Sequence, residues 1–466
     1  MRVLIATHFF AADQVGGTEV LTLGLARQLQ AAGHDVAVIC ADDWETAPDS
    51  QVRISDDMVQ DIPVRRLHFN WMKAPDVFRY LYDNPAAEEL TAAYIDEFQP
   101  DILHVTSCYS LSGSIVSAAR SRGVPVVLTA TDFWFVCGRN TLLRSDQTLC
   151  CGPVTAWDCT QCMLAGTKIF RLSSRLLPER VAKAGFGALG RRSFVTRRRG
   201  LRGMHGNWDE RSATLRRFLN EVDLIVTASE YVHQRLIAFG APAERIVTSA
   251  YGLDSSWAAG YSRKTSSPVV RFGFIGQAIP MKGVHILLRA VAAVDRSVDF
   301  TLKVYGNLDK DQEYGARLRA IAGEDPRIQF CGTFPNEDMG RILTSIDVLV
   351  VPSLWYDFPL VIPSAFATHT PVIATDLPGM NEMVEDGASG FLFERGNWRQ
   401  LAAILRRLAM QPEMATCLAA GVPAVKSDRQ MVAEYVEHYR SLLQGAGAVE
   451  ALPVGAHAEL LERAWE

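Results

Sequence analysis

Short runs of apolar residues alternate along the chain with stretches in which apolar residues recur every three or four positions. Arg2–Thr7 predicts a buried strand, Thr18–Ala32 predicts a helix with Leu21 and Leu25 on its apolar face, and Asp35–Cys40 predicts the next strand. This alternation predicts an α/β domain with a parallel sheet that helices cover on both faces. The pattern continues in the strands Asp101–Thr106, Pro125–Thr129, Val222–Thr227 and Arg245–Ser249, and in the helices Leu111–Arg122 and Glu230–Phe239.

A second series of the same kind follows a stretch rich in Ser, Gly and Lys at Ser255–Pro268. We therefore expect two Rossmann-like, doubly wound domains, residues 1–257 and 268–430, that face a cleft, with an insertion at 133–217 in the first. The strands of the second series are expected at Val269–Ile275, Asp299–Tyr305, Ile328–Cys331, Val348–Val351, Pro371–Ala374 and Gly390–Phe393.

Two of the predicted strand–helix connections carry glycines. In the second domain the loop Gly276–Gly283 leads into a helix that begins near Gly283, and Lys282 stands at its far end. Backbone N–H groups and the positive end of a helix dipole suit an anion at such a place, and the lysine adds a full charge. Gly16-Gly17 gives the first domain a comparable loop. An ordinary strand–loop–helix corner with a solvated lysine is the alternative, but two such loops across one cleft favour a phosphate-containing ligand. The first loop lacks the G-x-G-x-x-G spacing of dinucleotide-binding proteins, which argues against NAD or FAD.

The net charge of −5 conceals a strongly basic segment. Lys168 to Arg217 contains 14 Lys and Arg against three acidic residues, and the Gly and Pro within it predict several short helices rather than one. Three interpretations remain open: a solvated surface insertion, docking to an anionic membrane surface, and nucleic-acid binding. Nucleic acid is the least favoured partner, because no recognition helix or set of stacking aromatic residues accompanies the charge.

The remaining composition is typical of a globular protein, with 48% hydrophobic and 21% charged residues. No run of about 18 apolar residues is present, so we expect no membrane-spanning helix. Met1–His8 predicts a first strand rather than a signal peptide. We therefore expect the protein in the cytoplasm, and the basic segment adds the hypothesis of a peripheral position at the inner face of the cell membrane.

Five of the nine cysteines lie within 26 residues, between Cys137 and Cys162. In a cytoplasmic protein such a cluster favours a metal over disulfides. A C-x₂-C pair with two further cysteines fits a tetrahedral structural zinc site, with Cys151 left over and no open coordination position. Free thiols or a redox pair are the alternative. The expected zinc ligands are Cys137, Cys150, Cys159 and Cys162.

Taken together, these motifs resemble those of retaining glycosyltransferases of family 4, also called group 1, which have the GT-B fold. The resemblance covers roughly residues 1–440 and implies a late helix at 431–445 that returns to the first domain, with 446–466 left as a tail. It is carried by Gly16-Gly17, Tyr251–Asp254, Gly276–Gly283 with Lys282, Pro352-Ser353, Pro371–Asp376, Gly379 and Glu382.

The resemblance implies that the second domain binds a nucleotide-diphosphate sugar and that the acceptor is a carbohydrate or lipid-linked carbohydrate in polysaccharide or glycolipid assembly. Lys282 and the Gly17 backbone would stabilise the leaving diphosphate, so no catalytic metal is expected. Asp357 would hold hydroxyl groups of the donor sugar, and retention at the anomeric carbon would follow the family. The expected donor site comprises Gly16, Gly17, Gly276, Gln277, Lys282, Asp357, Leu360, Val361 and Ser364, with Lys282 and Asp357 as catalytic candidates.

The chain departs from the family pattern at several positions. Gln277 stands in place of an arginine, and Ser364 stands in place of the second of two glutamates. Thr131 replaces a histidine and His369 replaces a glycine. The first two changes remove a cation and a ribose-binding carboxylate, so an alternative stays open: a catalytically impaired subunit that binds sugar nucleotides or partners through its zinc and basic insertion. Epimerisation of a sugar nucleotide is a third hypothesis, which the basic segment disfavours because a soluble substrate needs no docking surface.

Overall fold

The computed structural model describes residues 1–11, 16–42, 52–71, 73–150, 155–192, 204–261, 263–355 and 358–445. The chain forms two compact units, one of residues 1–251 with 428 onward and one of residues 252–427. Several predictions lie outside the described residues: the tail at 446–466, part of the basic segment at 193–203, Cys151 and Asp357.

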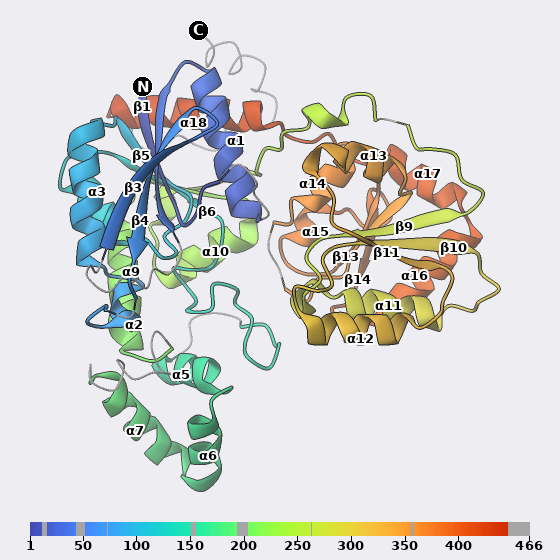
Figure 1. Ribbon diagram of the computed structural model, residues 1–466, viewed down its shortest axis with the longest axis horizontal. Helices are drawn as coiled ribbons and strands as arrows, with labels where there is room; N and C mark the ends of the chain where they lie inside the picture. The colour runs from blue at the N-terminus through green and yellow to red at the C-terminus, as the bar shows by residue number, and fades with distance from the viewer. Residues whose placement is uncertain are drawn as a thin grey trace. The chain divides into compact units, whose positions relative to one another are not determined.

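The first unit is built on one sheet, whose described strands are β1 (Arg2–Thr7), β2 (Asp35–Asp42), β3 (Val52–Val59), β4 (Ile62–Phe69), β5 (Ile102–Val105), β6 (Val126–Ala130), β7 (Leu224–Thr227) and β8 (Ile246–Thr248). Their order across the sheet is β3-β4-β2-β1-β5-β6-β7-β8 (Figure 1). The described pairs are parallel except β3 with β4. Every residue of β5, β6 and β7 is buried, as expected for strands covered on both faces.

The antiparallel hairpin of β3 and β4 was not expected from the sequence pattern. β3 is a polar edge strand in which most side chains are exposed, so it lacks the apolar run of its neighbours. Cross-strand ion pairs hold it instead: Arg65 lies 2.8 Å from Asp56, and Arg66 lies 2.9 Å from Asp57. The prediction of a purely parallel sheet is therefore corrected at this edge.

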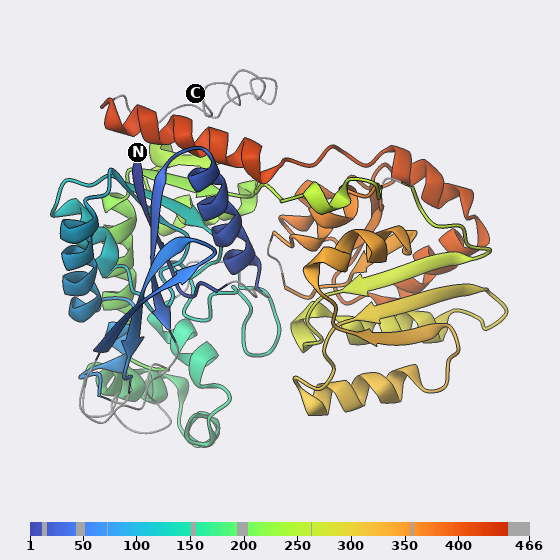
Figure 2. The same cartoon turned by 45° about the horizontal axis from the view of Figure 1, so that its top comes forward.

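Helices cover both faces of the first sheet. α1 and α18 lie side by side on one face in both views, and α3, α4 and α9 pack together on the other (Figure 1 and Figure 2). The short helices α6 and α7 lie in the expected basic segment, with Pro178 between them, and α5, which contains no Lys or Arg, precedes that segment. The described helices of this unit are α1 (Gly17–Ala31), α2 (Val77–Tyr80), α3 (Pro85–Phe98), α4 (Ser114–Arg120), α5 (Ala156–Leu164), α6 (Lys168–Leu176), α7 (Glu179–Gly190), α9 (Trp208–Glu221), α10 (Glu230–Phe239) and α18 (Asp428–Leu443).

The late helix α18 packs on this first unit through buried polar contacts. The Tyr439 hydroxyl is hydrogen-bonded to His104 Nδ1 in β5, and the Tyr435 hydroxyl lies 2.9 Å from Thr129 Oγ1 in β6. Burial lowers the pKa of His104 to about 3, so the imidazole is neutral. The helix begins at Asp428, three residues before the predicted start.

The second unit contains β9 (Val270–Ile275), β10 (Phe300–Tyr305), β11 (Ile328–Gly332), β12 (Val348–Val351), β13 (Val372–Thr375) and β14 (Gly390–Phe393), each within one residue of its predicted bounds. All described pairs are parallel, in the order β11-β10-β9-β12-β13-β14. The first helix of this unit is α11 (Val284–Ala293). Its apolar face, with Leu287 and Leu288, is fully buried against this sheet.

Helices flank this second sheet as well. α11, α12 and α16 lie on one face, and α13 and α14 lie on the other (Figure 1). Throughout the described ranges, we find no helix with the length and hydrophobicity that crossing a bilayer requires. The described helices of this unit are α11 (Val284–Ala293), α12 (Gln312–Ala322), α13 (Met339–Thr344), α14 (Val361–Phe366), α15 (Met380–Met383), α16 (Trp398–Met410) and α17 (Glu413–Ala420).

Candidate functional site

The strand order of the second unit defines where a ligand is expected. β9 lies at the centre, and the chain proceeds outward to β10 and β11 on one side and to β12 and β13 on the other. In open parallel sheets, ligands bind outside the carboxyl ends of the strands where this direction reverses. The loops at that point are the one that follows Ile275 in β9 and the one that follows Val351 in β12.

These two loops are packed tightly against each other. The Leu354 amide donates to the Met281 carbonyl at 2.8 Å. Gly283 has a φ of +72°, and a Cβ atom there would lie 1.8 Å from the Pro352 carbonyl oxygen. Both the backbone conformation and the close approach exclude a side chain, so glycine is required at this position. The Gly276 amide in turn donates to the Tyr305 carbonyl at 3.1 Å, which fixes the start of the loop.

Lys282 stands where the two loops meet. It is the last residue of a short 3₁₀ turn, Pro280–Lys282, directly before α11. Its ammonium lies 5.2 Å from the centre of the Trp355 ring, and the buried Trp355 Nε1 has no hydrogen-bond partner in the described residues. The half-buried Lys282 is thus held at the carboxyl ends of the central strands, as the sequence predicts.

A second cation stands near Gln277, and it was missed in the sequence. The Lys310 ammonium donates to Gln277 Oε1 at 3.5 Å. Lys310 lies in the loop after β10, the strand next to β9, so parallel pairing brings the two loops to the same edge of the sheet. Strand adjacency was the signal that would have suggested a cation from the loop after β10 near Gln277.

The residues expected to serve the phosphates and the ribose are only partly described. Leu360 and Val361 lie at the start of α14, where a helix offers backbone N–H groups to a ligand. The Ser364 side chain is buried, and its hydroxyl donates to the Leu360 carbonyl at 2.8 Å. Its hydrogen is therefore used within the helix, and it supplies no carboxylate. Asp357 lies outside the described residues.

His369 occupies a backbone conformation that glycine favours. Its φ is +52° and its side chain is exposed, which explains why the family carries glycine here. We expect His369→Gly to raise the free energy of unfolding by up to about 1 kcal/mol, because relief of left-handed strain exceeds the extra flexibility of the unfolded chain. Urea denaturation measures the change. His369→Ala removes the imidazole and keeps the Cβ atom, so equal stability of the Ala and Gly variants would contradict the explanation.

The first unit gathers polar groups at the carboxyl ends of β1, β5 and β6. Gly16 and Gly17 begin α1, and a Cβ atom on Gly16 would lie 2.0 Å from a Glu19 carboxylate oxygen. His8, directly after β1, lies 3.2 Å from Glu19, and this hydrogen bond lowers the pKa of the Glu19 carboxyl. The Glu19–His8 pair was missed, because neither residue belongs to a recognisable spacing. Asp132, after β6, accepts from the Trp134 amide at 2.8 Å.

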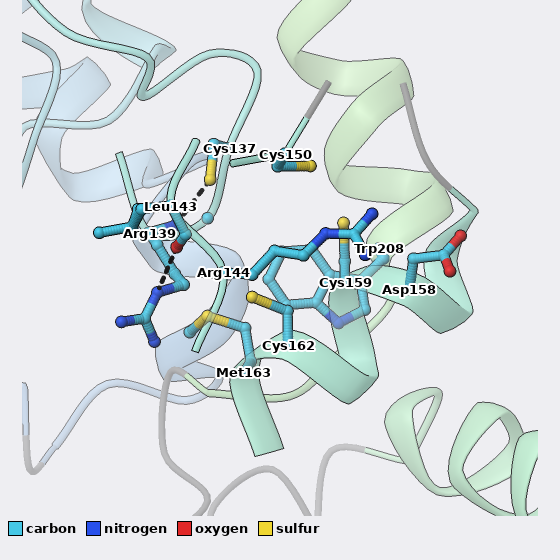
Figure 3. A pocket seen from close by; sticks show the side chains of 11 residues that line it. Cys137, Arg139, Leu143, Arg144, Cys150, Asp158, Cys159, Cys162, Met163 and Trp208 are labelled. Carbon is cyan, nitrogen blue, oxygen red and sulfur yellow. Dashed lines mark hydrogen bonds between the residues drawn. The ribbon is translucent and has the colours of Figure 1, made fainter. Parts of the chain in front are cut away.

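The four predicted metal ligands line one cavity in the first unit (Figure 3). Burial, together with the smaller effect of the neighbouring Cys137, raises the pKa of the Cys159 thiol to about 12. Burial also raises the pKa of Cys162. Among the described residues, no three His, Cys, Asp or Glu side chains already stand in an arrangement that holds a metal ion.

Two segments of the chain match family models of glycosyltransferases. Residues 269–411 match the model described as "Glycosyl transferases group 1", and residues 16–150 match the "Glycosyl transferase 4-like domain". The first match contains the packed loops around Lys282, and the second contains Gly16, Gly17 and the hairpin from Cys137 to Cys150.

Curated relatives include glycosyltransferases that act in bacterial polysaccharide biosynthesis. The amylovoran biosynthesis glycosyltransferase AmsK of Erwinia amylovora is 28% identical over 243 residues, which are 49% of this chain and 57% of that protein. A D-inositol 3-phosphate glycosyltransferase of Corynebacterium urealyticum is 31% identical over 196 residues, 40% of this chain and 46% of that protein. The matches thus span about half the length of these relatives.

Solved structures resemble the chain over most of its length. Sucrose-phosphate synthase from Thermosynechococcus elongatus has a TM-score of 0.64 at 17% identity, covering 95% of this chain and 99% of that one. Anabaena HepE in complex with UDP and glucose has a TM-score of 0.61 at 16% identity, covering 95% and 100%. Residues 16–150 and 269–411 thus match glycosyltransferase domain families, within two parallel-sheet units that have the GT-B glycosyltransferase fold.

Proposed function

We propose that this protein is a glycosyltransferase that moves a sugar from a nucleotide-diphosphate donor to a carbohydrate acceptor in polysaccharide or glycolipid assembly. The observation that carries the proposal is the junction of the two loops at the strand reversal of the second unit. Gly283 lets the loops touch, and Lys282 is held at their meeting point. A fixed cation beside the backbone N–H groups of a helix start suits a diphosphate.

The chemistry that this arrangement supplies is stabilisation of a leaving group. As the bond from the sugar to the diphosphate breaks, negative charge grows on the phosphate oxygens, and a preorganised cation lowers the barrier. Lys282 would supply that charge, with the amides of Leu360 and Val361 as further donors, so transfer would need no divalent metal. Asp357 would bind hydroxyl groups of the donor sugar. Retention of anomeric configuration, the family's stereochemistry, belongs to the same proposal.

A second candidate is a subunit that binds sugar nucleotides with little or no catalysis. Ser364 favours it, because its hydroxyl is bonded within α14 and no carboxylate takes the place of the family's glutamate. Lys310 argues for an active enzyme, because it restores a cation beside Gln277.

Calorimetric titration tests the proposed function directly. UDP-, GDP-, ADP- and dTDP-sugars are titrated into the wild-type chain, and one nucleotide class is expected to bind with a micromolar Kd, about −8 kcal/mol. Transfer from the bound sugar nucleotide to a lipid-linked carbohydrate is then assayed with and without added Mg²⁺, with equal rates expected. Binding without any transfer would favour the second candidate, and absence of binding across the panel would contradict both.

We also propose that α6 and α7 dock to an anionic lipid surface, where a lipid-linked acceptor would be held. Leu172 and Leu176 on α6 are 61% and 71% exposed, and Val181 on α7 is also exposed. Apolar side chains among cations are the combination that binds the headgroup region of anionic bilayers. The exposed basic residues on and beside these helices are Lys168, Arg171, Arg175, Arg180, Lys183, Arg191 and Arg192.

Vesicle co-sedimentation measures this docking. We expect the chain to bind vesicles of phosphatidylglycerol and phosphatidylcholine in equal parts, and to be released as salt screens the charges. Leu172→Ser with Leu176→Ser should weaken binding several-fold, whereas Met410→Ser, an exposed apolar residue on α16, should not. Equal binding to pure phosphatidylcholine, or binding that salt leaves unchanged, would exclude the proposal.

A further inference from the structure

Four cysteine side chains from two separate elements surround one small cavity in the first unit (Figure 3). Cys159 and Cys162 stand one turn apart on α5. Cys137 and Cys150 stand at the two ends of a hairpin loop, which the Leu143–Leu149 bridge closes. The Cys150 amide donates to the Leu142 carbonyl at 2.7 Å, which holds that end of the loop in place. Structural zinc sites commonly have four cysteine ligands, here two from a hairpin and two from a helix.

The cavity is large enough for a single ion. Its volume is about 30 Å³, above the roughly 10–15 Å³ that one water molecule needs. Since no three potential ligands in the described residues already stand at ligand spacing, an ion would draw the thiols inward by rotation of cysteine side chains between staggered positions.

The charges around the cavity suit a cluster of thiolates. A zinc ion with four thiolates carries a net double negative charge, and Arg139 and Arg144 line the same cavity. Arg211 interacts with the Cys137 and Cys159 thiols and is only 7% exposed. Its guanidinium donates to the Trp134 carbonyl at 2.5 Å, and among the described residues it has no carboxylate at ion-pair distance. Burial of this cation is costly. The Cys137 and Cys159 sulfurs stabilise its charge more than the Asp132 carboxylate does, and metal-bound thiolates would supply that counter-charge.

Backbone and side-chain N–H groups also point to bound thiolates. The Arg139 amide donates to Cys137 Sγ at 3.4 Å. Trp208 lines the cavity, and its buried Nε1 has no hydrogen-bond partner in the part of the chain that is described. The indole is packed against Gly138, where a Cβ atom would lie 2.6 Å from the ring. Hydrogen bonds from such donors fix the orientation of metal ligands and affect how tightly the metal is bound.

We propose that Cys137, Cys150, Cys159 and Cys162 bind one Zn²⁺ as thiolates. Each thiol releases its proton to solvent as its zinc–sulfur bond forms, four protons in all, and no electron is transferred. No coordination position remains open, so the ion is structural. It fastens the hairpin loop onto α5, which in turn contacts α7 and α9. The ion therefore determines how the basic helices are attached to the first unit.

Metal analysis of the full chain tests the site. Protein purified without chelator is measured by inductively coupled plasma mass spectrometry, and about one zinc per chain is expected. Cys159→Ala should lose at least nine-tenths of the zinc, while Cys417→Ala, which removes an exposed thiol on α17, should retain it. Stoichiometric iron would overturn the zinc assignment, and so would a disulfide among the four cysteines in protein alkylated before digestion.

A second measurement does not depend on how well the variants fold. Wild-type protein stripped of metal is titrated with cobalt chloride, and the visible spectrum is followed. Four thiolates around Co²⁺ give strong tetrahedral absorption bands together with sulfur-to-metal charge transfer. These bands should saturate at about one equivalent and disappear when Zn²⁺ is added. Zinc-free protein that also fails to bind cobalt contradicts the proposal.

Discussion

Lys282→Gln is expected to lower kcat for sugar transfer by about 10²–10³-fold, the loss measured when one group that stabilises transition-state charge is removed. Glutamine keeps most of the length of the side chain and loses its charge. The ammonium lies 5.2 Å from the Trp355 ring centre, and the loop that carries it is fixed by the Leu354–Met281 hydrogen bond. The backbone around position 282 should therefore stay in place in the variant.

The expected losses in kcat and in donor affinity depend on how much negative charge the diphosphate carries before the reaction and how much develops during it. The diphosphate is already anionic in the bound donor, so part of the lysine's interaction is present before reaction and would appear in the Kd. The further charge that develops as the glycosidic bond breaks would appear in kcat alone. We therefore expect donor affinity to fall about tenfold or more, as for loss of one charge-assisted hydrogen bond, and kcat to fall by the larger factor.

Lys310→Gln is the matched control for Lys282→Gln. Lys310 is exposed and lies 3.5 Å from Gln277, so it should contribute to binding of the diphosphate more weakly than the half-buried Lys282. Initial rates over a range of donor concentrations separate kcat from KM for both variants. If Lys282→Gln retained kcat within about threefold of wild type, or if Lys310→Gln proved the more damaging change, the assignment of Lys282 to the leaving group would be wrong.

The sequence pattern predicted the second unit better than the first. The central strands β9, β12 and β13 are short apolar runs between turn residues, and they are buried almost throughout, as expected for strands covered on both faces. β3 and β4 escaped prediction, because Asp56, Asp57, Arg65 and Arg66 interrupt any apolar alternation and stabilise each other only once the strands are paired. Local pattern thus identifies buried strands, and it misses an edge hairpin that cross-strand charges hold.

The residues of the candidate sites also differ in whether local sequence pattern could identify them. Gly283 and Lys282 could be identified from a strand–loop–helix sequence, because both residues of the proposed anion site lie within one continuous segment. Lys310, Trp208 and Arg211 could not, because each reaches its site through pairing or packing between segments far apart in the chain. The cysteines were found from their spacing, and the cations near them were not.

Lys264 is expected to make the stability of the second unit rise with pH. Its ammonium is mostly buried and donates to the Leu343 carbonyl at 2.8 Å and to the Thr370 hydroxyl. Burial lowers its pKa from 10.5 to about 7, and the nearby Asp347 opposes this only in part because Arg271 is paired with that carboxylate at 2.7 Å. The folded unit thus carries a nearly neutral lysine in mildly alkaline solution.

The direction of the effect follows from proton binding in the two states. Between pH 7 and 10.5 the unfolded chain holds a proton on Lys264 that the folded chain has lost. The free energy of unfolding then rises by up to about 1.4 kcal/mol per pH unit, or about 2–3 kcal/mol between pH 7.5 and 9.5. Below pH 7 the lysine is protonated in both states and adds no slope.

Lys264→Met should remove this contribution, so the difference in unfolding free energy between wild type and variant should change by about 2–3 kcal/mol over the same interval. Because the chain has two units, urea unfolding is best followed by hydrogen exchange in peptides that contain β9 and β12, which report on the second unit alone. Lys310→Met, an exposed lysine of the same unit, should leave the wild-type slope unchanged. Parallel pH profiles for wild type and Lys264→Met would mean that the lysine keeps its proton when folded, and that its two acceptors compensate fully for its burial.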